Sequence, residues 1–144
     1  ESSINLGQFR NQKVWIGNPM TSGIENATYI PPEPDLVSKM VEKLLFDWKT
    51  DYETNLKSDS KTKINALVEF HFDFLKVHPF LDGNGRVARY ILNQQATEFF
   101  EIDYKVIIKD NDTYFSALNE GHKGNLEPLK LVLTQAIFGK ETVE

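Results

Sequence analysis

The stretch FHFDFLKVHPFLDGNGRVAR, residues 70–89, says more about the fold than any other part of the sequence. Its first half is apolar around most of a helical circumference, which is typical of a central helix surrounded by other helices. Pro79 disfavours helical geometry in the residue before it, so this helix, which starts at about residue 62, must end near His78. Two glycines then precede a second periodic run, which predicts a new helix from about Gly85.

The residues before this stretch predict one small hairpin and one helix. Residues 14–30 read as two short strands around a turn-rich segment, and PPEP at 31–34 reads as a linker. We expect Asp35 to cap the helix that follows. Its expected buried face has helical spacing and consists of Val37, Val41, Leu44, Leu45 and Trp48. The polar residues 49–61 are expected to be mostly loop.

The residues after it predict two more helices. YKVII at 104–108 reads as a short extended link, and helices are expected near 111–121 and 127–138, with Gly139 as the stop. The expected fold class is therefore all-α, a compact helical domain with a small β-hairpin. A length of 144 residues suits a single domain spanning 1–144.

Composition excludes several classes of function. The formal charge of −5 argues against a nucleic-acid-binding module, which normally carries a basic stripe. The absence of cysteine excludes disulfides, thiolate zinc sites and cysteine nucleophiles. No apolar run approaches the roughly 18 residues of a membrane span, and no signal peptide opens the chain, so we expect no membrane partner and a cytoplasmic location. The start, ESSINLGQF, lacks an initiator Met, so we expect a fragment of a longer chain.

The loop between the two central helices combines features of a phosphate site. Gly83 and Gly85 allow close approach of the backbone to a ligand. The helix that begins near Gly85 directs its unpaired N–H groups and the positive end of its dipole into the loop. Arg86 and Arg89 lie one turn apart on the same face, where cations are unfavourable unless an anion binds. A di- or triphosphate fits this arrangement.

Two further side chains add chemistry beside the phosphate site. Asp82 offers one hard oxygen ligand, which together with substrate phosphates is the usual protein contribution to a Mg²⁺ site. His78 has an ordinary pKa near ~6.5, which suits a general base. Each residue alone also has an ordinary structural interpretation as a helix cap, a turn residue or a solvated charge. The combination favours a Mg-nucleotide site in which a hydroxyl is deprotonated. Other motifs fail: there is no GxxxxGK(S/T) loop, DNDTYF at 110–115 lacks the EF-hand glycine, and His71 reads as a core histidine.

HPFLDGNGR at 78–86, with the second arginine at 89, resembles the signature HPFx(D/E)GNGRxxR of Fic-domain proteins at every fixed position. GQFR at 7–10, the KVWIG…YIPP segment and GNLEPL at 124–129 are also similar to that family. The resemblance implies a helical Fic core with a hairpin flap, and transfer of AMP from ATP to a Ser, Thr or Tyr hydroxyl of a target protein. It assigns His78 as the base, Asp82 as the Mg²⁺ ligand and the active-site loop to residues 78–86. The nucleotide-binding residues would be Gly83, Asn84, Gly85, Arg86 and Arg89.

The resemblance also implies partners. The target protein would dock on the flap at about residues 14–30 by adding a strand. Many Fic proteins are inhibited by a helix carrying (S/T)xxxE(G/N), whose glutamate pairs with the second arginine. TSGIEN at 21–26 matches those letters but lies in the predicted flap turn, so we expect the inhibitory helix upstream of Glu1, beyond Glu144 or on an antitoxin-like partner. His122 falls near a position where relatives often carry a nucleotide-contacting Asn, which leaves the base preference open. The oligomeric state is also open, a homo-oligomer included.

Three alternatives remain on the same site. Related motifs support transfer of UMP, phosphocholine or phosphate, although the phosphocholine and kinase-like variants alter the GNGR portion that this chain retains. Removal of AMP from a modified protein would use the same groups with a water molecule. A non-catalytic, nucleotide-responsive binding module would not need His78 as a base.

Overall fold

The computed structural model describes residues 7–17 and 23–139. Two short strands come first, β1 (Ile16–Gly17) and β2 (Ala27–Tyr29), with a single 3-10 turn at Ile24–Asn26 between them. The rest of the described chain is dominated by helices. They are α1 (Pro34–Leu56), α2 (Ser60–Val77), α3 (Asn84–Phe100), α4 (Asn111–His122) and α5 (Glu127–Phe138). The predicted all-α class with one small hairpin is confirmed.

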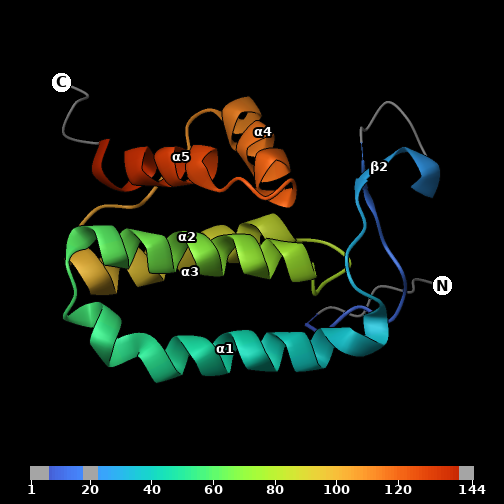
Figure 1. Ribbon diagram of the computed structural model, residues 1–144, viewed down its shortest axis with the longest axis horizontal. Helices are drawn as coiled ribbons and strands as arrows, with labels where there is room; N and C mark the ends of the chain where they lie inside the picture. Colours follow the sequence, from blue (N-terminus) through green and yellow to red (C-terminus); the bar gives the residue numbers. More distant parts are fainter. Residues whose placement is uncertain (1–6, 18–22, 140–144) are drawn as a thin grey trace.

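The helices form three tiers, and α2 lies at their centre. Figure 1 shows α1 along one side, the α2–α3 pair in the middle and the α4–α5 pair on the opposite side. Helix α2 contacts each of the other four helices. The hairpin stands at one end of the stack, the same end as the loop between α2 and α3. The predicted central helix is therefore confirmed, and its C-terminal end faces the hairpin.

The main core lies between α2, α3, α4 and α5. Its fully buried members include Leu67 of α2, Leu92 of α3, Tyr114 of α4, and Leu129 and Leu133 of α5. A second cluster around Phe70 and Phe74 extends toward α1 and the loop, and includes Phe80. Burial of such side chains contributes roughly 1.5–3 kcal/mol each. Phe80 packs against this cluster and so anchors the loop between α2 and α3 on the core.

Helix α1 differs from the prediction at both ends. It begins at Pro34, with Glu33 as its N-cap, so Asp35 lies in the first turn and caps nothing. Proline is favoured at the first helical position because its missing N–H needs no partner there. The helix continues to Leu56 because no glycine or proline interrupts 49–56, and Tyr52 and Leu56 pack on the main core. Leu45, expected on the buried face, is instead 53% exposed.

The ends of α2 and α5 follow local signals. Helix α2 starts two residues before the predicted position, because the side chain of Asp59 accepts a hydrogen bond from the Thr62 N–H at 2.9 Å. It ends at Val77, as Pro79 requires. Helix α5 spans the predicted residues, and Gly139 is its C-cap.

The hairpin is short and irregular. Ile16 pairs with Tyr29 and Gly17 with Ala27 in antiparallel register, with a bulge between the two pairs. The hydroxyl of Tyr29 donates to the carbonyl of Lys76 at 2.8 Å, which ties β2 to the end of α2. Within residues 7–17 and 23–139, no helix has the length and apolarity needed to cross a membrane.

Candidate nucleotide-binding active site

The loop between α2 and α3 reverses direction through two left-handed residues. His78 is the C-cap of α2, with φ 53° and ψ 63°, and its N–H donates to the carbonyl of Phe74 at 3.1 Å. Gly83 is the N-cap of α3, with φ 86° and ψ 8°. A left-handed conformation costs a non-glycine residue about 1 kcal/mol or more, so the surrounding structure must hold His78 there.

Asn84 closes the loop with its side chain. Its Oδ1 accepts from the N–H of Phe80 at 2.9 Å, and its Nδ2 donates to the carbonyl of Phe80 at 2.7 Å. The side chain is buried and bonded at both ends of its amide, so the backbone N–H is the group of Asn84 that the start of α3 directs toward a ligand. That N–H belongs to the first turn of α3, which starts without a side-chain cap. Uncapped first-turn N–H groups have no intrahelical partner and attract anions.

Both arginines fold back over the glycines of the loop. A Cβ atom at Gly83 would lie 3.1 Å from an Nη atom of Arg86, and one at Gly85 would lie 3.0 Å from an Nη atom of Arg89. This is the direction expected of long helical side chains, which point toward the N-terminus. The two guanidinium groups therefore stand beside the uncapped start of α3, as the sequence predicted.

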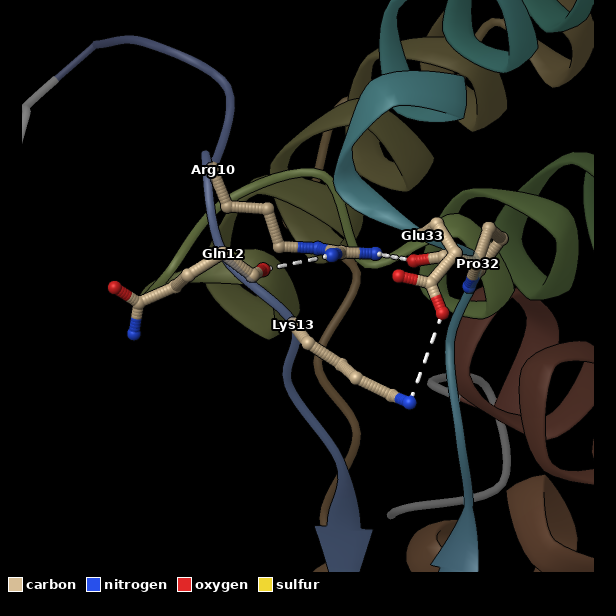
Figure 2. A network of polar contacts seen from close by, with 5 residues as sticks. All are labelled: Arg10, Gln12, Lys13, Pro32 and Glu33. Carbon is tan, nitrogen blue, oxygen red and sulfur yellow. Dashed lines mark hydrogen bonds and ion pairs between the residues drawn. The ribbon is translucent and has the colours of Figure 1, made fainter.

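Arg10 holds the far side of the loop. Its Nε donates to the carbonyl of His78 at 2.6 Å, and its Nη2 donates to the carbonyls of Pro32 at 2.6 Å and Val77 at 3.2 Å. Its Nη1 donates to Gln12, and its backbone N–H donates to the carbonyl of Pro79. Figure 2 shows the guanidinium lying between Gln12 and Pro32. Arg10 thus fastens the end of α2, the hairpin lead-in and the 31–33 linker to one another.

The environment of His78 favours its neutral form. Burial lowers the pKa of His78, and the positive charge of Arg10 lowers it further. A neutral imidazole accepts a proton, so a lowered pKa keeps a larger fraction of His78 in the base form at neutral pH. His78 is half-buried and lines the cavity described below.

Asp82 lies at the exposed rim of the loop. Its side chain is 84% exposed, and its Oδ2 is 4.0 Å from an Nη atom of Arg86. Within the described ranges, no group of three His, Asp or Glu residues is placed to hold a metal ion. One exposed carboxylate beside a phosphate site does fit Mg²⁺, which usually takes one or two carboxylates and completes its shell with phosphates and water.

A cavity of about 570 Å³ joins the loop to the hairpin and α4. Of the predicted site residues, it is lined by His78, Asn84, Gly85 and Arg89, whereas Gly83, Arg86 and Asp82 are not among its lining residues. Ile16, Gly17 and Thr28 of the hairpin form one wall. A larger cavity of about 910 Å³ lies between the 104–110 segment and α5, and contains none of the predicted site residues.

The wall formed by α4 contains His122. Its ring stacks on Tyr29 with centroids 3.9 Å apart and packs on Phe72 at 5.1 Å. Burial and the charge of Lys76 lower the pKa of His122, which keeps this stacked ring neutral at neutral pH. Asn119 lines the same cavity close to His122. The cavity therefore contains an asparagine as well as the histidine.

Three residues of the site carry no clear functional signal in the sequence: Arg10, which holds the loop, and Tyr114 and Asn119, which line the cavity. Arg10 stands out only as part of GQFR, because a single arginine in a polar segment is normally solvated. Tyr114 is 1% exposed and contacts Arg89, but an aromatic residue at helical spacing reads as core. His71, expected to be a core histidine, is buried as predicted.

The segment that resembles an inhibitory motif is not a longer helix in its described part. Ile24–Asn26 form one 3-10 turn, while Thr21 and Ser22 lie outside the described residues. Across the described ranges, no carboxylate lies within 4.0 Å of Arg89, and Glu25 is exposed. The prediction that this segment forms no inhibitory helix agrees with the residues that are described.

The sequence is similar to one protein family and to several curated proteins. The Fic/DOC family matches residues 2–96. The protein adenylyltransferase Fic of Drosophila willistoni is 25% identical over 129 residues, covering 87% of this chain and 22% of the relative. The protein adenylyltransferase fic-1 of Caenorhabditis elegans is 26% identical over 125 residues, with the same coverage. The chain thus spans about a fifth of the length of the curated relatives it matches.

Solved structures agree in fold. A fragment of Fic-1 from C. elegans is 27% identical, with a TM-score of 0.63 over 78% of this chain and 32% of that one. A Fic-domain-containing signaling protein from Bacteroides thetaiotaomicron is 16% identical, with a TM-score of 0.66 over 95% of this chain and 55% of that one, and shows likeness of fold alone. With two thirds of its sequence matched by the family and its helices arranged as in these structures, this chain belongs to the Fic/DOC family.

Proposed function

We propose that this chain is the core of a protein adenylyltransferase, which transfers AMP from ATP to a Ser, Thr or Tyr hydroxyl of a target protein and releases pyrophosphate. One observation carries the proposal: His78, the uncapped start of α3 and Arg89 all line a single cavity. A base and an anion site facing the same space are what transfer of a phosphorus group to a hydroxyl requires. The names of the curated relatives support the same reaction.

In the proposed reaction, the hydroxyl oxygen of the target bonds to the α-phosphorus of ATP. The bond from the α-phosphorus to the oxygen that bridges it to the β-phosphorus breaks, and pyrophosphate leaves. His78 accepts the hydroxyl proton through a ring nitrogen, helped by the burial and the Arg10 charge that lower its pKa. The N–H groups of Asn84 and Gly85 hold negative oxygens of the phosphate chain, and Arg86 and Arg89 neutralise its far end.

Mg²⁺ is the metal that fits the residues present, and Asp82 is the residue proposed to hold it. When bound, the ion neutralises charge on the phosphate oxygens. The exposed position of Asp82 at the loop rim leaves its carboxylate accessible to an ion that arrives with ATP.

The hairpin is the proposed docking site for the target protein. Among the described residues β1 and β2 form a two-stranded sheet, so each strand has one edge without a partner there. An extended segment of a target can add to such an edge through backbone hydrogen bonds. Ile16, Gly17 and Thr28 line the cavity that contains His78, so a docked segment would pass close to the base.

The proposal is tested by incubating the protein with Mg²⁺ and ATP labelled in either the α- or the γ-phosphate. We expect slow self-labelling from α-labelled ATP only, because AMP is transferred. His78→Ala should abolish the label, because the variant lacks the imidazole that is proposed to accept the hydroxyl proton. Label that persists in this variant contradicts the role of His78, and label from the γ-phosphate indicates a kinase.

A second variant tests the proposed role of Asp82 as a Mg²⁺ ligand. Asp82→Ala should lower self-labelling by a factor of about 100 or more with Mg²⁺ in excess, because an active-site carboxylate that binds metal contributes several kcal/mol. Asp51→Ala, which removes an exposed carboxylate from α1, is the matched control and should label at the wild-type rate. Equal rates for the two variants would remove Asp82 from the mechanism.

A further inference from the structure

A buried pair of polar side chains, Tyr114 and His71, lies next to Arg89 and has no role in the proposed reaction. The hydroxyl of Tyr114 on α4 is 2.6 Å from Nε2 of His71 on α2. The Cζ atom of Arg89 on α3 lies 6.0 Å from the centroid of the Tyr114 ring. Three helices of the core therefore meet at one tyrosine. Both Tyr114 and His71 are 1% exposed, so the pair is sealed from solvent.

The guanidinium of Arg89 has an unusual setting for a cation. It stands next to Gly85 at the start of α3, where the helix dipole disfavours positive charge. Arg86 at least faces the carboxylate of Asp82, whereas Arg89 has no carboxylate within 4.0 Å in the part of the chain that the structure describes. The side chain of Tyr114 lies beside it, with the ring centroid 6.0 Å from the Cζ atom of Arg89.

The direction of the hydrogen bond between Tyr114 and His71 follows from the cation beside it. Arginine has only donors, so the hydroxyl oxygen of Tyr114 can interact with the guanidinium of Arg89 only as an acceptor, and its proton then points to His71. His71 must then present an unprotonated Nε2, which requires the neutral imidazole. Burial, with the charge of Arg89 adding to it, lowers the pKa of His71 to about 4, and burial raises the pKa of Tyr114 to about 12. Tyr114 and His71 are therefore both neutral, and the charge of this three-residue network lies on Arg89, which faces the cavity.

We propose that Tyr114, backed by His71, is a positioning residue that aims the guanidinium of Arg89 at the distal end of a bound nucleotide's phosphate chain and thereby favours a triphosphate over a monophosphate. The proposal rests on the proposed nucleotide site. Its physical basis is the loss of freedom of a long side chain: an arginine held in advance by a rigid ring loses less conformational entropy when the anion binds. Tyr114 touches no reacting atom, and its effect passes through Arg89.

The variant that separates positioning from packing is Tyr114→Phe, which keeps the ring in the core and removes only the hydroxyl. We expect its affinity for ATP to fall about tenfold and its affinity for AMP to change less than about twofold, because AMP does not reach Arg89. Tyr104→Phe is the matched control, since it removes a tyrosine hydroxyl that donates to the carbonyl of Ile137 away from the cavity. It should bind both nucleotides as the wild type does. In the Arg89→Ala background, Tyr114→Phe should have no further effect on ATP affinity.

A second measurement needs no nucleotide. The chain has only three arginines, so their Nε–H signals can be assigned in a nitrogen-detected NMR spectrum. In the wild type the signal of Arg89 should exchange with water more slowly than that of exposed Arg86, and in Tyr114→Phe the two should become alike. His71→Gln, which removes the imidazole behind the phenol, should shift Arg89 in the same direction by a smaller amount.

The two measurements separate the possible failures. If the wild type binds ATP but Tyr114→Phe keeps both its ratio of ATP to AMP affinity and its Arg89 signal, Tyr114 does not position Arg89. If the wild type binds no nucleotide, the proposed function fails, and the NMR comparison alone decides whether Tyr114 holds Arg89. Equal losses of ATP and AMP affinity would indicate damage to the whole cavity and overturn the inference.

Discussion

Replacement of Arg10 by methionine should destabilise the protein strongly, although the sequence places this arginine in a polar segment. Arg10→Met keeps an unbranched apolar stem but removes the donors that bind the carbonyls of His78, Val77 and Pro32. Those carbonyls then lie in a site where Arg10 was 3% exposed, so water cannot fully replace the lost bonds. The left-handed backbone of His78 also loses the group that holds it.

The magnitude can be estimated from these bonds. A hydrogen bond to a charged donor contributes roughly 1.5–3 kcal/mol, and burial of the guanidinium, which also lowers the pKa of Arg10, offsets part of the sum. We therefore expect Arg10→Met to lower the free energy of unfolding by about 3–5 kcal/mol, measured by urea denaturation. The melting temperature should fall by about 10 °C or more.

The matched control lies three residues along the same segment. Lys13 makes an exposed ion pair with Glu33 at 3.6 Å, which Figure 2 shows beside the Arg10 network. Such pairs contribute about 0–1 kcal/mol, so Lys13→Met should change stability by no more than about 0.5 kcal/mol. If Arg10→Met and Lys13→Met differ by less than about 1 kcal/mol, Arg10 is not the clamp of the active-site loop, and the account of how His78 is held is wrong.

Two further predictions concern buried polar groups. The pKa of His71 is about 4 in the folded protein and ~6.5 in the unfolded chain. When the pH is lowered from ~7 to ~5, the unfolded chain therefore takes up a proton that the folded protein does not. This group lowers the free energy of unfolding by about 2 kcal/mol over that range. Urea denaturation of His71→Gln should lack that part of the pH dependence, and identical pH profiles would refute the assignment. Asn84→Ala should cost about 2 kcal/mol because both bonds to the backbone of Phe80 are lost. A thermal shift below about 2 °C would show that Asn84 does not close the loop.

Local sequence signals accounted for most of the helical framework. Pro79 ended α2 at Val77, Asp59 capped its start and the spacing of apolar residues placed α5 at the predicted residues. Helix breaks, caps and helical spacing depend on residues within about four positions of one another, so they can be predicted from the sequence. The prediction for 49–61 was wrong because the stretch is polar. Tyr52 and Leu56 are spaced to continue the buried face of α1 from Trp48, and they pack on the core.

The candidate site was predicted in part. His78, Asn84, Gly85 and Arg89 of the motif line one cavity, whereas Asp82, Gly83 and Arg86 do not. Asn84 has a second task that the motif did not reveal, because its side chain binds the backbone of Phe80. The roles of all these residues in catalysis and binding stay predictions until the proposed assays are made.

What the order of residues predicts here is the loop and its inventory: a helix break, two glycines, two cations, a carboxylate and a base within twelve positions. What it could not predict is the support around that loop. Arg10 reaches the carbonyl of His78 across 68 residues, and Tyr114 meets His71 across 43. Such partners leave no periodic signal, since each depends on how the hairpin and the helices pack. The chemistry of the site is therefore a local property of the chain, whereas the rigidity that aims it arises from contacts between distant segments.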